Sequence, residues 1–167
     1  YKYLNKITDE KNIFINCIDT IIRQVSTIHR MVNEFSTFAQ MPRPIFRNVN
    51  INEIIMGSIS MTKLANQKLL ITSNLDSIDK IFLKADPNLI NQALNNLFKN
   101  SINSINEHKK NIVGKINISL YRKNNMCHLD FIDNGIGFPV NKEHLLEPYI
   151  SRSKKGSGLG LAVIKKI

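Results

Sequence analysis

The stretch FIDNGIGFP, residues 131–139, joins an apolar run to a turn and so marks the end of a strand. Asp133 closes the apolar run, and Asn134, Gly135 and Gly137 follow it. Asparagine and glycine tolerate positive φ, so the stretch predicts a tight turn. An aspartate followed by two glycines also suits a ligand contact, because glycine lets the backbone approach a bound group. Taken alone, the stretch is more typical of a simple turn.

The segments around this turn predict an α/β layer with a mixed sheet. Apolar and alternating runs predict strands at residues 46–51, 69–75, 80–86, 115–122 and 126–133. Apolar faces at helical spacing predict a helix at 52–67, a second from Pro87 and a third from Ser157. Lys-Asn-Asn at 123–125 predicts a hairpin turn between the last two strands. A long polar connection fills residues 134–156.

Residues 8–40 carry the heptad spacing of a helical bundle or coiled coil. The apolar positions alternate steps of four and three: Phe14, Ile18, Ile21, Val25, Ile28, Val32, Phe35 and Ala39. Pro42 and Pro44 end the pattern, since proline cannot continue the helical ladder. A single helix cannot bury such a stripe, so we expect a partner helix or a second copy of the chain.

The helix from Pro87 combines a broad apolar face with a face rich in asparagine. Gln92, Asn96, Asn100 and Asn103 follow one another at steps of four, four and three. A solvated polar stripe is one explanation of this face. Asparagine is a poor helix former, however, and its amide oxygen is a neutral ligand for Mg²⁺. A metal and phosphate contact is therefore the second explanation.

The last segment, KKGSGLGLAVIKKI at residues 154–167, leads three glycines into an apolar helix start. Backbone N–H groups at such a start attract phosphate, and Arg152, Lys154 and Lys155 add positive charge. The glycine spacing fits neither a Walker A loop nor a dinucleotide fingerprint. A flexible loop before a helix is the alternative explanation.

The three motifs occur in one order within one α/β region, and together they resemble the GHKL family of ATP-binding domains. The N box of that family is matched by residues 96–105, NLFKNSINSI. Its first glycine box is matched by residues 133–138, DNGIGF, and its second by residues 156–161, GSGLGL. Residues 21–44 resemble the second helix of the dimerisation domain in sensor histidine kinases; their sequence is IIRQVSTIHRMVNEFSTFAQMPRP. When residues 147–167, EPYISRSKKGSGLGLAVIKKI, are considered as well, the chain looks most like the nitrogen-regulation (NtrY-like) sensors.

The resemblance implies an α+β fold, a two-layer α/β sandwich of the Bergerat type with helices on one face of a mixed sheet. A long coiled-coil-like dimerisation helix precedes it. We expect residues 1–41 to be that helix, 42–47 a linker and 48–167 an ATP-binding domain that is incomplete at its C-terminal end. Both ends of the chain look cut, because it begins at Tyr1 and stops within a helix.

The resemblance also assigns roles to single residues. It implies that Asp133 accepts a hydrogen bond from the adenine amino group and that Gly135 and Gly137 pass close to the base. It implies that Asn100 is the Mg²⁺ ligand and that Asn96 faces the nucleotide. The further implied contacts to ATP are Asn103, Tyr149, Lys155, Gly156, Ser157, Gly158, Leu159 and Gly160. The resemblance also implies that the loop 138–155 is a lid over the phosphates, and within it ISRS, residues 150–153, replaces the Thr-Thr-Arg-like run of the family pattern.

A histidine kinase transfers the γ-phosphate to a His that an acidic residue follows, and then to an Asp of a response regulator. None of the histidines here fits that pattern; His29, for example, precedes Arg30. We therefore place the acceptor on a first dimerisation helix upstream of Tyr1 and expect the 167-residue chain to be inactive as an autokinase. The implied partners are a second copy, paired through residues 14–39, and the receiver domain of a response regulator.

Composition excludes several other classes. The net charge of +10 comes from scattered basic residues without interleaved aromatics, so a nucleic-acid partner is not predicted. Cys17 and Cys127 predict reduced thiols and a cytoplasmic location, and no His or Cys spacing suits a structural metal. No apolar run approaches the ~18 residues of a membrane span, so we expect any inner-membrane anchor outside this chain.

Two alternative functions stay open: a catalytically silent dimerisation module and a GHKL ATPase that acts on nucleic acid.

Overall fold

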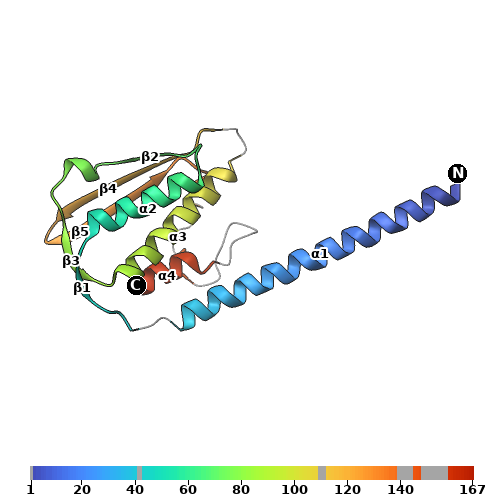
Figure 1. The fold of residues 1–167 in the computed structure, drawn as a ribbon, viewed down its shortest axis with the longest axis horizontal. Coiled ribbons are helices and arrows are strands. Elements are labelled where there is room, and N and C mark those ends of the chain that lie inside the picture. Colours follow the sequence, from blue (N-terminus) through green and yellow to red (C-terminus); the bar gives the residue numbers. More distant parts are fainter. Residues whose placement is uncertain (1, 41–42, 109–111, 139–144, 148–157) are drawn as a thin grey trace. The chain divides into compact units, whose positions relative to one another are not determined.

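The computed structural model describes residues 2–40, 43–108, 112–138, 145–147 and 158–167. The chain divides into two compact units, Tyr1–Met41 and Pro42–Ile167. The first consists of helix α1, and the second holds the remaining labelled elements (Figure 1). No helix among these residues is both long enough and apolar enough to cross a membrane.

Helix α1 (Lys2–Ala39) is a continuous helix of 38 residues. It begins before the predicted start at residue 8, because neither glycine nor proline interrupts residues 2–39. The predicted heptad stripe is exposed along its described side chains: Phe14, Ile18, Ile21, Val25, Ile28, Val32 and Phe35. Helices gain most of their stability from packing an apolar face, and this stripe is left exposed by the rest of the described residues.

The second unit contains a mixed set of strands, as predicted, but they form two sheets. β1 (Arg47–Asn50) and β3 (Phe82–Ala85) pair antiparallel. β2 (Leu70–Ser73), β4 (Lys115–Lys123) and β5 (Met126–Asp133) form a sheet in the order β2-β4-β5. β2 runs parallel to β4, and β4 runs antiparallel to β5.

The turn between β4 and β5 is the predicted hairpin turn. Asn124 and Asn125 have φ angles of 51° and 60°. Positive φ at both central residues is the signature of a type I′ turn, whose twist matches that of the two strands. Asparagine is the residue type other than glycine that adopts this conformation most readily.

The described part of the unit also contains three α-helices, α2 (Ile51–Ala65), α3 (Pro87–Asn106) and α4 (Gly160–Lys166), and a short 3-10 helix, η1 (Leu75–Ser77). α2 and α3 lie side by side, and α4 lies against α3 (Figure 1). The core forms between these helices and the strands, and its fully buried side chains are Ile55, Leu94, Ile116, Ile118 and Leu120. The last helix starts at Gly160 rather than at Ser157, and Leu159 before it is buried.

Two asparagine side chains extend the pairing of β4 beyond its partner strands. After β2 ends, the Asn74 amide accepts from Leu120 N and donates to Leu120 O, both at 2.9 Å. After β5 ends, the Asn134 amide accepts from Lys115 N at 2.7 Å and donates to Val113 O at 2.9 Å. Each amide takes the place of a backbone peptide group, so neighbouring polar groups of β4 are satisfied.

Asp86 caps α3, as the sequence predicts, and also holds the chain segment before β1. Its Oδ1 accepts from Asn88 N at 2.8 Å and Leu89 N at 3.4 Å, and its Oδ2 accepts from Ile45 N at 2.7 Å. The N–H of Ile45 is the main cause that lowers the pKa of Asp86 below the ordinary value of 3.8. The charged carboxylate therefore stabilises the start of α3, the helix that carries the asparagine face.

Asp86→Asn tests this capping interaction, because asparagine keeps an acceptor for α3 and loses the charge. A lowered folded pKa means that the stabilisation is complete above 3.8 and is lost as pH falls through the folded value. We expect the variant to unfold at a lower urea concentration at neutral pH, followed by circular dichroism, and the difference to shrink in acid. Asp76→Asn, at an exposed carboxylate, is the control. A difference that does not change with pH would contradict this role.

Candidate functional site

Helix α3 presents its asparagines beside the core rather than within it. Leu94 and Phe98 are buried, and this packing fixes the rotation of the helix about its axis. Asn100 is consequently exposed, while Asn96 and Asn103 are half-buried. The predicted polar face of α3 is thus accessible along the turns that carry the motif.

Asp133 lies at the end of β5 and points toward α3. It shares a side of the strand with Phe131, whose ring packs edge-on against Phe98 of α3 at 4.9 Å between centroids. Ser101 donates its hydroxyl hydrogen to Asp133 Oδ2 at 2.9 Å, and Gly135 N donates to Oδ1 at 2.9 Å. Both carboxylate oxygens are held in place, and each keeps a lone pair for a further donor.

The glycine turn after β5 packs directly on α3. A Cβ at Gly135 would overlap with Ser104 Oγ and lie 2.7 Å from Ile105 N, so no larger residue fits without a shift of the backbone. Ile136 N donates to Ser104 O at 3.2 Å and closes this contact. Gly137 has a φ of +69°, a conformation that favours glycine. The structure therefore gives Gly135 a packing role that the sequence does not reveal.

The start of α4 meets the same helix. A Cβ at Gly160 would lie 3.6 Å from Asn96 Oδ1 and from both amide atoms of Asn100. Leu159, Ala162 and Val163 are buried and hold α4 in this position. The N box therefore lies next to the second glycine box, although the two motifs are about 60 residues apart in the chain.

Several predicted site residues can be placed and others cannot. The structure brings Asn96 and Asn100 to Gly160, and it brings Asp133 and Gly135 to α3. Four predicted positions lie outside the described residues: Tyr149, Lys155, Gly156 and Ser157. Sequence reasoning missed Ser101 and Ser104, although both directly follow asparagine face positions, Asn100 and Asn103, in the N box.

The donor set of this region fits a metal that arrives with its own ligands. Within the described ranges, no three His, Cys, Asp or Glu side chains form a group that could hold a metal ion. The exposed Asn100 offers one neutral oxygen. Mg²⁺ is commonly bound through few protein oxygens, with water and substrate phosphates as its other ligands. Asn100 therefore suits Mg²⁺ bound to a nucleotide.

Comparison with known proteins connects this geometry to a family. Residues 85–167 match the family model described as histidine kinase-, DNA gyrase B- and HSP90-like ATPase. The nitrogen regulation protein NtrY of Azorhizobium caulinodans is 37% identical over 99% of this chain, which covers 22% of that protein. An NtrY-like sensor histidine kinase of Rickettsia felis is 34% identical over 95% of this chain, which covers 26% of it. The chain thus spans about a quarter of the length of these relatives.

A solved structure supports the fold. The nucleotide-free catalytic domain of histidine kinase ThkA aligns with a TM-score of 0.61 at 24% identity, over 74% of this chain and 79% of that domain. The predicted α+β fold of helices over mixed strands is confirmed by this likeness. Residues 85–167 thus form a domain of the histidine kinase-, DNA gyrase B- and HSP90-like ATPase family, and the chain as a whole is similar to the NtrY-like sensor histidine kinases.

Proposed function

We propose that residues 48–167 bind Mg-ATP and serve as the phosphoryl donor of a sensor histidine kinase. The observation that carries this proposal is the meeting of three motifs on α3. Asp133 is hydrogen-bonded to Ser101, Gly135 packs on Ser104, and Gly160 lies against Asn96 and Asn100. The match of residues 85–167 to an ATPase family model supports the proposal that ATP is the nucleotide.

Asp133 is the proposed reader of adenine. A carboxylate only accepts hydrogen bonds, so it suits the amino group of adenine and not a carbonyl edge. Ser101 and Gly135 N fix the orientation of the carboxylate before the nucleotide arrives, which lowers the ordering cost of binding. Gly137, in its positive-φ conformation, leaves the backbone beside the base free of side chains.

Asn100 is the proposed Mg²⁺ ligand, with Asn96 and Asn103 facing the nucleotide. Mg²⁺, when bound, neutralises charge on the phosphates. Gly160 lies near Asn100, where the phosphates would lie, and Gly158 and Leu159 directly precede it in the chain. The remaining proposed contacts are Tyr149, Lys155, Gly156 and Ser157.

The acceptor of the phosphoryl group is proposed to be a histidine outside this chain. Each histidine here precedes a basic or apolar residue rather than an acid. The exposed stripe of α1 supports pairing with a second copy and with the acceptor helix. We further propose that the phosphoryl group is relayed to an Asp of a response regulator. The proposed location is cytoplasmic, with an inner-membrane anchor elsewhere in the protein. These parts of the proposal rest on the similarity to sensor kinases.

Asp133→Asn should weaken Mg-ATP binding about 10- to 100-fold in calorimetric titration, because its amide NH₂ would face the adenine amino group. Asp130→Asn is the matched control, since Asp130 is exposed on the other face of β5. Unchanged affinity in the Asp133 variant would refute the adenine assignment. Failure of the unmodified chain to bind ATP would instead support the catalytically silent dimerisation module.

Asn100→Ala should separate metal-dependent from metal-independent binding. We expect its affinity for ATP to fall about tenfold in the presence of Mg²⁺ and to equal that of the unmodified chain in EDTA. Asn95→Ala removes an exposed asparagine from the same helix and should behave like the unmodified chain. Equal losses with and without Mg²⁺ would show that Asn100 does not act through the metal.

The purified 167-residue chain should not phosphorylate itself. Incubation with γ-labelled ATP and Mg²⁺ should leave no acid-labile label on the protein, because no histidine here fits the acceptor pattern. Label that mass spectrometry locates on His29, His108, His128 or His144 would disprove this expectation.

A further inference from the structure

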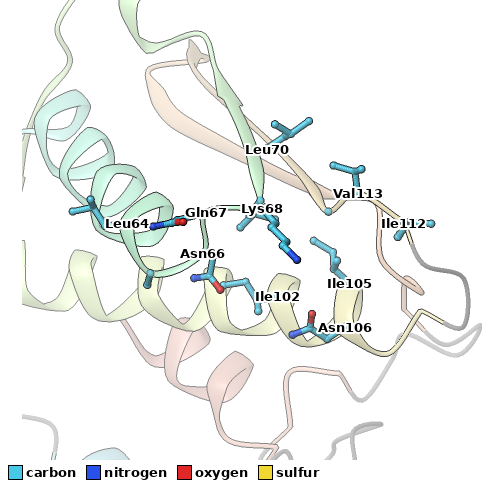
Figure 2. A pocket seen from close by; sticks show the side chains of 13 residues that line it. Leu64, Asn66, Gln67, Lys68, Leu70, Ile102, Ile105, Asn106, Ile112 and Val113 are labelled. Carbon is cyan, nitrogen blue, oxygen red and sulfur yellow. The ribbon is translucent and has the colours of Figure 1, made fainter.

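A groove with a volume of about 990 Å³ lies at the C-terminal end of α3, away from the candidate nucleotide residues. Ile102 and Ile105 form its α3 wall, and they lie about 200° around the helix from Asn100 and Asn103 respectively. The end of α2, the turn before β2 and the segment leading into β4 form the other walls (Figure 2). The groove and the proposed ATP site thus use different faces of one helix.

The walls of the groove are apolar and incompletely covered. Leu64, Leu70 and Val113 line it and are 75%, 53% and 58% exposed, which is high for large aliphatic side chains. Gly114 lets the opposite wall approach α3 closely, since a Cβ there would lie 2.9 Å from Ile105 Cγ2. An open apolar groove of this volume falls within the size range of sites for small molecules.

One cation, Lys68, enters this apolar space. Its backbone belongs to a turn that is closed by Leu69 N donating to Asn66 O at 2.9 Å, and Asn66 Nδ2 donates to Thr62 O at 3.2 Å. Figure 2 shows the Lys68 side chain reaching toward Ile105 of α3. Among the described residues, no carboxylate lines the groove and none forms an ion pair with Lys68.

We propose that this groove binds a small amphiphile with a carboxylate head, such as a medium-chain aliphatic monocarboxylate. The apolar walls on Ile102, Ile105 and Val113 take the chain, and Lys68 binds the carboxylate. The neutral amide of Asn106, which lies on the same side of the groove as the Lys68 head in Figure 2, can donate to the same oxygens. Because the positive charge of Lys68 lies beside an aliphatic surface, the groove favours an anionic amphiphile over a neutral lipid or a positively charged ligand.

Decanoate, kept below its micelle concentration, is the probe for titration into the 167-residue chain, followed by amide NMR shifts. We expect saturable one-to-one binding with shifts confined to residues 64–70, 102–106 and 112–114. Lys68→Met keeps the apolar stem and should weaken binding up to about fivefold. Val113→Asp places a like charge at the exposed groove and should weaken it about tenfold or more.

Lys63→Met is the matched control, because Lys63 is an exposed lysine of α2 that does not line the groove. All three variants should bind Mg-ATP as the unmodified chain does, so failure of this proposal is separate from failure of the ATP assignment. Absence of saturable binding, or binding that neither Lys68→Met nor Val113→Asp weakens, would overturn the proposal. A change of oligomeric state in Val113→Asp without decanoate binding would instead assign the groove to a contact between copies and overturn it too.

Discussion

The hydrogen bond from Ser101 to Asp133 joins the end of β5 to α3, and the proposed nucleotide site depends on this junction. Ser101 is buried, and its hydroxyl lies 2.9 Å from the carboxylate. The missing side chain of Gly135 lets the following turn rest on the same helix, and Ile136 N bonds to Ser104 O. A wider separation of strand and helix would leave the carboxylate with only one of its two orienting donors, Gly135 N.

Helix α3 has to meet several demands at once. Its Leu94 and Phe98 fill the core, its asparagines face the proposed nucleotide, and Ile102 and Ile105 form a wall of the groove. The cap at Asp86 fixes where the helix begins, and core packing fixes its rotation. These constraints explain why asparagine, a poor helix former, is tolerated in the helix: burial of the other face stabilises it.

The sequence predicts the order and type of the elements well, because each has a strong local pattern. The heptad of α1, the cap at Asp86 and the Asn-Asn turn are all local, and the structure contains each of them. Non-local contacts could not be predicted this way. The division into two sheets and the amide pairing of Asn74 with β4 depend on which segments meet in space. The contact of Gly135 with Ser104 has the same cause, since glycine in a turn already has a local explanation.

If the proposed function is right, a nucleotide binds at the asparagine face of α3 and not at the groove face that carries Ile102 and Ile105. Amide NMR spectra of the chain, recorded with and without a non-hydrolysable ATP analogue and Mg²⁺, test the central claim most directly. The account predicts shifts in residues 96–104, 133–137 and 158–161, with residues 64–70 and 112–114 unaffected. Shifts confined to the groove residues, or no saturable shifts at all, would contradict the assignment of the site.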